Sequence, residues 1–486
     1  MSIKRQFGNG VAWMTAGGWI EQALNFIVFI LLARLLGAEA FGLMAMASVF
    51  VVLSEVLVRD SLSEFLIAKE SPTKGHFNAA FWQLATVGCL LTVAILLASD
   101  WIARFYGQET VKTMLMVLSP TVLLVALEGV PVVILRRDLN FAILAIRAVS
   151  GVVLGGIVGL YMALNGYGVW SLVAQRLVLI ITNFVIVWVT VPWRPSTKYS
   201  KSEFRDVLRF GTSVLALRAA DLTRTQVPTV IISAYLGPTV LGLFSIAWRM
   251  IELASFLIVT PLRMVSQPAF AAMARAGDDE AGLLLEISRL SGLIAFPAFF
   301  GLSILSLPFL TLLFGDHWID AAPILSIISV VGIYLTIEKV NEAFCLAAGR
   351  AGGLAMVGWA EVILAIALVW GAAAWGIQGM SVAFVLSFVL FWPARFWIVS
   401  NLAQIPMVRL IAPHIKPCLC ALVMAVCVKG VMGGLPEMRP LVTILIAAGL
   451  GLLIYAALTM VFMRDRAMTL LSILKRDGNS SDNSAI

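Results

Sequence analysis

The chain has 486 residues, of which 61% are hydrophobic and 13% are charged, and its net charge is +7. Soluble proteins are about half apolar and about a quarter charged, so this composition excludes a water-soluble fold. The apolar residues fall in runs of about 20 or more, each long enough to cross a hydrocarbon layer of about 30 Å as a helix. Runs such as 152–164 and 441–463 lack the alternating polarity of barrel strands. The sequence therefore predicts an all-α integral membrane protein.

Hydropathy and helix-breaking residues predict about fourteen membrane-spanning helices, within a range of about twelve to fourteen. In chain order we expect them at 10–35, 41–58, 78–99, 113–133, 142–163, 169–191, 210–235, 240–262, 291–314, 321–347, 353–372, 376–394, 413–433 and 440–463. The run 11–36 is too long for a signal peptide and lacks a small-residue cleavage site, so we interpret it as a retained first helix.

The distribution of positive charge predicts the orientation, because short loops rich in Lys and Arg stay in the cytoplasm. With the N-terminus inside, most of the 34 basic residues fall in segments on the cytoplasmic side, including Arg395 just after the span 376–394. We therefore expect a multi-pass protein of the bacterial inner membrane with both termini in the cytoplasm. This asymmetry explains the net charge without a nucleic-acid partner.

An internal repeat divides the sequence. Residues 32–47 align without gaps on 232–247, and further landmarks recur at a similar offset, 105–107 with 313–315 and 168–169 with 376–377. The matched positions in the first window are Leu36/Leu236, Gly37/Gly237, Gly42/Gly242, Leu43/Leu243 and Ala47/Ala247. A repeat with an even number of helices enters the membrane in the same direction each time, which gives a parallel pseudo-repeat.

The repeat predicts the domain organisation. We expect a six-helix N-terminal lobe at 1–200, a six-helix C-terminal lobe at 201–400 and two additional helices within 401–466. The last segment, 467–486, is rich in Ser, Asn and Asp and is predicted to be a disordered cytoplasmic tail.

Several charged residues fall inside the predicted spans, where a charge is costly and usually faces a bundle interior or a wet cavity. The basic ones are candidates for binding an anionic substrate, because guanidinium groups bind phosphate in a bidentate manner. They are Arg147, Arg176, Arg218, Arg224, Arg249 and Lys339. The candidates for binding a coupling H⁺ or Na⁺ are Glu21, Asp221, Glu338 and Glu342.

A structural interpretation of these charges competes with the functional one. Asp221 lies three residues from both Arg218 and Arg224, and Glu252 lies three residues from Arg249, so ion pairs within one helix are geometrically easy. The five cysteines fall inside predicted spans and behave as small hydrophobic residues, and the three histidines lie far apart in the chain. We therefore expect neither a metal site nor a bound cofactor.

Several ordered motifs carry a family resemblance. They are Leu32-Ala33-Arg34-Leu35-Leu36-Gly37 with Phe41-Gly42-Leu43, Phe81-Trp82, Arg104-Phe105-Tyr106-Gly107, Arg136-Arg137-Asp138-Leu139, Gly168-Val169-Trp170-Ser171-Leu172-Val173-Ala174-Gln175, and Leu313-Phe314-Gly315. With these motifs the chain resembles bacterial polysaccharide exporters of the Wzx type. These exporters belong to the multidrug/oligosaccharidyl-lipid/polysaccharide (MOP) superfamily, together with MATE drug exporters and lipid II flippases. Many relatives have glycine after the residue matching Asp60, where this chain has Ser61.

The resemblance implies a MATE-like fold and a flippase rather than an enzyme. The implied substrate is an undecaprenyl-diphosphate-linked oligosaccharide repeat unit, moved from the cytoplasmic to the periplasmic leaflet for exopolysaccharide or lipopolysaccharide biosynthesis, with a polysaccharide polymerase and co-polymerase as partners. Two alternatives stay open. One is a MATE-like exporter of drugs or other lipid-linked substrates. The other is a polytopic polysaccharide-assembly enzyme, which the short predicted periplasmic loops and the lack of an Asp-x-Asp motif disfavour.

Overall fold

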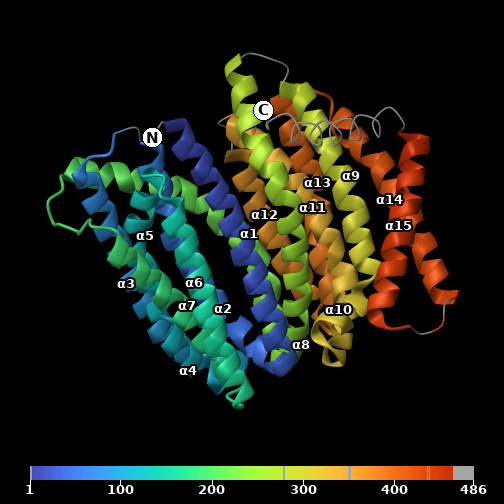
Figure 1. The fold of residues 1–486 in the computed structure, drawn as a ribbon, viewed down its shortest axis with the longest axis horizontal. Helices are drawn as coiled ribbons and strands as arrows, with labels where there is room; N and C mark the ends of the chain where they lie inside the picture. The colour runs from blue at the N-terminus through green and yellow to red at the C-terminus, as the bar shows by residue number, and fades with distance from the viewer. Residues whose placement is uncertain are drawn as a thin grey trace, which may run out of the picture. The chain divides into compact units, whose positions relative to one another are not determined.

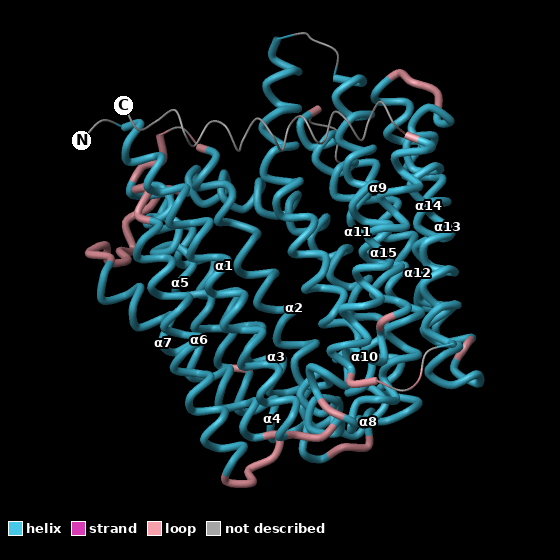
Figure 2. The backbone as a smooth tube through the Cα atoms, turned by 45° about the vertical axis from the view of Figure 1, so that its right-hand side comes forward, coloured by secondary structure: helices cyan, strands magenta, loops and turns pink. Residues whose placement is uncertain are grey.

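The computed structural model describes residues 3–69, 71–276, 280–348, 352–434, 436 and 438–463. These residues form helices joined by short connections, and none of them lies in a β-strand (Figures 1 and 2). The predicted disordered tail at 467–486 lies outside the described residues. The all-α prediction is confirmed.

The helices have the following bounds. They are α1 (Ile3–Leu35), α2 (Ala38–Ala68), α3 (Lys74–Tyr106), α4 (Glu109–Leu118), α5 (Pro120–Arg137), α6 (Phe141–Leu164), α7 (Trp170–Thr190), α8 (Lys201–Ala276), α9 (Glu280–Ile304), α10 (Ser306–Phe314), η1 (Asp316–Ala321), α11 (Ala322–Ala347), α12 (Gly352–Gly371), η2 (Ala373–Trp375), α13 (Gly376–Ala403), α14 (Met407–Gly434) and α15 (Pro440–Phe462).

The number of membrane-spanning helices agrees with the predicted range. Twelve segments of the described chain are long and apolar enough to cross a membrane, and the helix Met356–Gly371 is apolar but shorter. One of the twelve, Leu222–Leu262, has 41 residues. At about 1.5 Å per residue it would extend about twice the thickness of the hydrocarbon layer. Gly237, with φ +77°, breaks it into two helices, because glycine adopts this conformation without a steric penalty.

Several helices extend beyond their predicted bounds, and two of them are important for the description of the site. The helix α13 continues to Ala403, beyond the predicted end at 394, and α9 begins at Glu280, before the predicted start at 291. Apolarity predicts only the part of a helix that lies in hydrocarbon, whereas the backbone hydrogen bonds of a helix continue past that layer. The extension of α13 places Arg395 inside a helix instead of in a cytoplasmic loop.

By the density of its internal contacts the chain forms two compact units. The first comprises residues 1–246 and 358–380, and the second comprises residues 247–357 and 381–486. The boundary lies after Ile246, inside α8. The lobes predicted at 1–200 and 201–400 follow the sequence repeat instead of this division, and they stay a prediction.

Small residues bring helices close together within the first unit. A Cβ atom at Gly155 of α6 would lie 2.6 Å from the Gln175 carbonyl oxygen of α7. Gly151 and Gly159, one turn away on either side, also face α7. Lipid provides no hydrophobic force between helices, so close backbone approach at small residues supplies much of the packing attraction. The second unit has a similar contact, where Gly332 of α11 lies against the ring of Phe299 of α9.

A reciprocal contact joins the two sequence repeats within the first unit. A Cβ atom at Gly42 would lie 1.7 Å from the Pro238 carbonyl oxygen, and one at Gly242 would lie 1.8 Å from the Ala38 carbonyl oxygen. Residues 38 and 42 correspond to 238 and 242 in the repeat alignment. Equivalent residues therefore contact each other in both directions, as in a two-fold interface. This symmetry supports the predicted duplication, and it requires glycine at both positions.

Candidate functional site

In the first unit, the predicted basic residues on α6 and α7 each form an ion pair with a glutamate. Nη1 of Arg147 on α6 lies 3.1 Å from Oε1 of Glu128 on α5. Nη2 of Arg176 on α7 donates to Oε2 of Glu55 on α2 at 2.7 Å, and Oγ1 of Thr121 donates to the other oxygen of that carboxylate at 3.1 Å. Glu55 therefore joins α2, α5 and α7 at one buried point.

Arg224 of α8 forms a buried ion pair with Glu361 of α12, both in the first unit. Their side chains are only 5% and 1% exposed. A buried pair of this kind keeps its charges because each compensates the other, and removal of one partner is strongly destabilising. The geometry therefore gives Arg224 a structural role, holding α12 against α8.

The second unit pairs its predicted basic residues along single helices. Nη1 of Arg249 donates to Oε2 of Glu252 at 3.0 Å, which confirms the pairing expected from their spacing, and Nε1 of Trp248 donates to the other oxygen at 2.9 Å. Lys339 pairs with Glu342 on α11 in the same way. The side chains of Arg249 and Lys339 are 29% and 30% exposed, so both retain access to a ligand.

A further buried ion pair was missed by the sequence reasoning. Arg395 of α13 pairs with Glu338 of α11, both side chains are 4% exposed, and the guanidinium carbon lies 5.9 Å from the ring centroid of Tyr334. The sequence prediction placed Arg395 in a loop just after its span, whereas the structure places it inside α13 with a buried side chain. The apolar residues Phe396, Trp397, Ile398 and Val399 that follow it were the available signal that the helix continues.

The candidate residues for ion coupling have different surroundings. Glu338 and Glu342 lie on α11 as expected, but each pairs with a different cation, Arg395 and Lys339 respectively. Glu21 is half-buried on α1. The side chains of Arg218 and Asp221 lie outside the described part of the structure.

Carboxylate partners offset much of the positive charge of the candidate residues. Among the described candidates, each basic side chain has a carboxylate partner in its own unit. The buried pair Arg224–Glu361 is suited to holding helices together. The pairs of Arg147, Arg176, Arg249 and Lys339 are more exposed, and their cations retain N–H groups that can donate to a phosphate oxygen.

An apolar pocket of about 610 Å³ lies in the second unit among α8, α9, α14 and α15. Its walls include Leu257, Pro297, Met424 and Leu452. Tyr455 contributes a hydroxyl group, which already donates to the Leu293 carbonyl oxygen at 3.0 Å. The pocket is therefore suited to a hydrocarbon chain.

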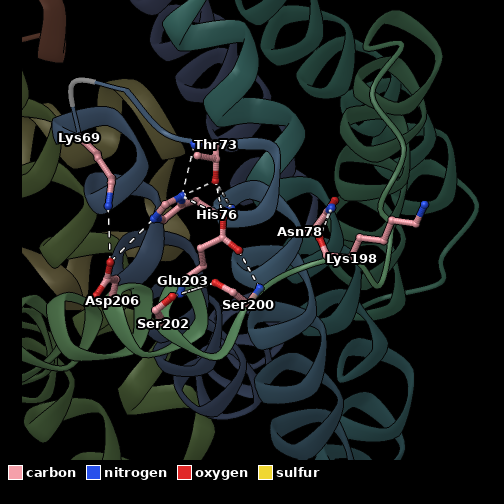
Figure 3. Close-up of polar contacts among 9 residues, drawn as sticks. All are labelled: Lys69, Thr73, His76, Asn78, Lys198, Ser200, Ser202, Glu203 and Asp206. Carbon is pink, nitrogen blue, oxygen red and sulfur yellow. Dashed lines mark hydrogen bonds and ion pairs between the residues drawn. The ribbon is translucent and has the colours of Figure 1, made fainter.

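A polar cluster fixes the start of α8 in the first unit (Figure 3). Thr73 caps α3, and its hydroxyl group donates to Glu203 of α8. Glu203 also accepts the backbone N–H of Ser200 at 2.7 Å, while Nδ1 of His76 accepts the backbone N–H of Thr73 at 3.2 Å. Asn78 donates to the Lys198 carbonyl oxygen at 3.0 Å. The connection between α7 and α8 is thereby bound to the start of α3.

The hydrogen bonds of this cluster, first of all the one from Thr73, lower the pKa of Glu203 from its ordinary value of 4.5 to about 2. A group whose pKa is lowered by folding stabilises the fold above its unfolded pKa. The contribution is therefore complete above about pH 4.5 and is lost as the pH falls toward about 2.

Glu203→Gln is expected to open this connection at neutral pH. Hydrogen exchange of peptides covering 196–206 should increase about fivefold, since one or more hydrogen bonds to a charged acceptor are weakened. Asp206→Asn is the matched control, because Asp206 is exposed and makes only long ion-pair contacts, at 3.6 Å to Lys69 and at 3.9 Å to His76. Equal hydrogen-exchange rates in the Glu203→Gln variant and the wild-type protein would show that the Glu203 carboxylate does not hold the connection between α7 and α8. The wild-type protein should keep its protection between pH 8 and pH 5 after correction for intrinsic exchange rates.

The chain is similar to known membrane proteins of polysaccharide biosynthesis and to transporters of known structure. The Succinoglycan biosynthesis transport protein ExoT of Rhizobium meliloti (strain 1021) is 23% identical over 96% of this chain and 95% of its own length. The structure of the Lipid II flippase MurJ in an inward closed conformation has a TM-score of 0.76 and 14% identity, with 93% of this chain and 99% of that chain covered.

An inward-facing multidrug transporter of the MATE family, itself in the MOP superfamily, has a TM-score of 0.59 and 16% identity over 79% of this chain and 96% of its own. These structural likenesses confirm the predicted MATE-like fold. The family model described as Polysaccharide biosynthesis protein matches residues 31–323, which is more than half of the chain. The chain therefore belongs to the polysaccharide biosynthesis protein family, as a multi-pass membrane protein with a MATE-like fold.

Proposed function

We propose that this protein is a flippase that moves lipid-linked oligosaccharide repeat units from the cytoplasmic to the periplasmic leaflet of a bacterial inner membrane. The observation that carries the proposal is membership of the polysaccharide biosynthesis family in a chain built almost entirely of membrane-spanning helices. The match to a succinoglycan transport protein along nearly the whole chain supports transport rather than enzymatic catalysis.

The substrate class in this proposal is an undecaprenyl-diphosphate-linked oligosaccharide used for exopolysaccharide or lipopolysaccharide. Within the second unit its diphosphate would bind the partly exposed cations Arg249 and Lys339, with the substrate replacing carboxylate oxygens as the acceptor. Arg147 and Arg176 are the equivalent candidates within the first unit. Part of the polyprenyl chain would occupy the apolar pocket of about 610 Å³ in the second unit. Release of Glu342 from Lys339 would free a carboxylate to bind a coupling H⁺ or Na⁺, and Glu21 is a second candidate.

The proposed topology places both termini in the cytoplasm, as the distribution of Lys and Arg predicts. The α1–α2 turn, which holds the reciprocal glycine contact, then lies on the periplasmic side. A polysaccharide polymerase and co-polymerase would receive the transported unit there. In this arrangement the contact of Gly42 and Gly242 closes the periplasmic side, and it must open once in each transport cycle.

Arg249→Ala and Lys339→Ala are expected to reduce export about tenfold or more, because each removes charge-assisted hydrogen bonds to the diphosphate that are worth about 1.5 to 3 kcal/mol. Arg249→Lys should restore part of the loss, since it retains the charge. Arg104→Ala is the matched control: Arg104 is highly exposed and pairs with Asp100 at the end of α3. Normal export by both alanine variants at equal membrane levels would remove these two cations from substrate binding.

The test of the proposed function is the identity of the lipid that accumulates when the gene is deleted. We expect lipid-linked oligosaccharide in the cytoplasmic leaflet, with loss of the surface polysaccharide and with normal synthesis of the unit itself. Accumulation of incomplete oligosaccharides would instead indicate an enzyme of assembly. Normal surface polysaccharide with increased drug sensitivity would indicate a drug exporter.

A further inference from the structure

A basic pocket and an apolar pocket adjoin each other on α9 and α14 of the second unit. The basic pocket, of about 290 Å³, is lined by the cations Arg289, Arg409 and Lys416 together with Leu285, Ala412 and Pro413. Among the described residues, no acidic side chain lines it. This pocket therefore presents concentrated positive charge between two helices that each qualify as a membrane span.

The apolar pocket, of about 440 Å³, is formed by α13, α14 and one residue of α9. Its walls include Phe296, Trp392, Phe396, His414 and Ile415. Residues 412, 413 and 416 face the basic pocket, while residues 411, 414, 415 and 418 face the apolar one. The two sets lie on the same turns of α14, so the pockets are side by side at one depth.

Polar atoms without partners point to a ligand in the apolar pocket. Both ring nitrogens of His414 and Nε1 of Trp392 are buried and have no hydrogen-bond partner among the described residues. His414 is only 7% exposed, and the centroid of its ring lies 6.4 Å from that of Phe296 and 6.1 Å from that of Phe396. Gly292 of α9 leaves the space that Nδ1 occupies. Buried N–H groups are costly when unpaired, so an acceptor oxygen supplied by a ligand would stabilise this arrangement.

We propose that these adjoining pockets bind an anionic phospholipid of the surrounding membrane. The phosphate contacts Arg409 and Lys416 and lies beside Arg289, while one acyl chain fills the apolar pocket. An ester carbonyl oxygen accepts an N–H from Trp392 or His414. Basic pockets between membrane helices on the cytoplasmic side are suited to anionic headgroups, and the start of α14 lies on the predicted cytoplasmic side.

Charge and exposure favour a phospholipid over a soluble anion or the transported lipid. Arg409 and Lys416 are exposed within the first three turns of α14, so a headgroup of the surrounding membrane can reach them without entry into the protein. The pocket beside them is almost wholly apolar, which a soluble phosphate would not fill. A polyprenyl diphosphate shares the phosphate and the hydrocarbon chain, so the experiment must separate it from a phospholipid.

The test measures binding of dioleoylphosphatidylglycerol and dioleoylphosphatidylcholine to the purified full-length protein by native mass spectrometry. We expect the anionic lipid to bind about tenfold or more tightly than the neutral one. The double variant Arg409→Gln/Lys416→Gln should lose about tenfold or more of that affinity, because each cation near a headgroup contributes appreciably. Trp392→Phe keeps an aromatic ring, although a smaller one, and removes the N–H, so it should weaken binding of both lipids a few-fold.

Lys429→Gln is the matched control, since Lys429 is exposed near the other end of the same helix. It should leave the affinity for both lipids unchanged. Equal binding of the two lipids to the wild-type protein, or unchanged affinity in the double variant, would overturn the proposal. Displacement of bound phosphatidylglycerol by undecaprenyl diphosphate at lower concentration would also overturn it, because the pocket would then belong to the transported lipid. Inorganic phosphate that competes equally well would show that no lipid is required.

Discussion

Replacement of Glu361 by glutamine is expected to cost about 3 to 5 kcal/mol of stability, because it removes the carboxylate that compensates the buried charge of Arg224. Arg224→Ala should cost a similar amount for the converse reason. Both side chains are almost wholly buried, and the pair joins α8 to α12 within the first unit. The measurement is the thermal unfolding midpoint of the detergent-purified protein, followed by tryptophan fluorescence.

Two controls separate loss of charge compensation from simple loss of contact. Glu252→Gln disturbs the more exposed pair with Arg249 and should change stability by no more than about 1 kcal/mol. The double variant Arg224→Met/Glu361→Leu should recover much of the stability, since hydrophobic replacement of a buried ion pair is often neutral. Unfolding midpoints in Glu361→Gln equal to those in Glu252→Gln would contradict a structural role for the pair.

Gly42→Ala and Gly242→Ala are expected to reduce export at least tenfold while the protein still reaches the membrane. The added Cβ atoms would overlap backbone carbonyl oxygens at 1.7 Å and 1.8 Å, and a backbone atom has no alternative rotamer to adopt. The reciprocal contact would then fail to close, and a transporter that depends on alternate opening of its two sides would leak or stall. Export is measured as surface polysaccharide per unit of membrane-bound protein.

Gly37→Ala is the matched control, because a Cβ atom at Gly37 meets nothing within 4 Å. This variant should export normally. The accessibility of an introduced cysteine is a second measurement, which distinguishes local opening of the contact from a general loss of stability. A cysteine placed at Thr239, beside the contact, should react faster with a membrane-impermeant thiol reagent in the Gly42→Ala background. Normal export together with unchanged reactivity would show that closing this contact is not part of transport.

Much of the fold follows from the sequence because membrane helices are specified locally. A helix formed by a run of apolar residues satisfies its backbone hydrogen bonds within itself and needs no distant partner. The division of Leu222–Leu262 into two helices at Gly237 could therefore be predicted from the helix-breaking residues in the sequence. The same reasoning predicted the pair Arg249–Glu252, because residues three apart share a helix face.

The partners of the most buried charges could not be predicted from the sequence. Arg224 and Glu361 are separated by 137 positions, and Glu338 and Arg395 by 57, so no local pattern joins them. The hydrogen bond from Thr73 to Glu203 likewise connects two polar segments, for which hydropathy predicts no structure or contact. The sequence predicted that Arg224 and Glu338 lie inside membrane-spanning helices, and both are buried. It did not predict the distant partners Glu361 and Arg395 that pair with them.

The ion pairs also change how the substrate's phosphate groups would bind to these cations. A set of unpaired arginines would attract any anion, whereas a paired cation binds a phosphate either through its remaining N–H groups or by exchanging its carboxylate for the phosphate. In the proposed function, exchange of this kind would make substrate binding dependent on the release of Glu252 from Arg249 or of Glu342 from Lys339. The released carboxylate is then available to a proton or a sodium ion, which would connect substrate binding with ion coupling in a single step.

The proposed function requires this chain to move a lipid-linked oligosaccharide across a bilayer. The most direct measurement reconstitutes the purified protein in sealed vesicles carrying a fluorescent undecaprenyl-diphosphate oligosaccharide on one leaflet. A membrane-impermeant glycosidase then reports arrival of the sugar on the other leaflet. We expect transfer with the wild-type protein and at least tenfold slower transfer with Gly42→Ala. Transfer no faster than in protein-free vesicles, with and without a proton or sodium gradient, would contradict the account.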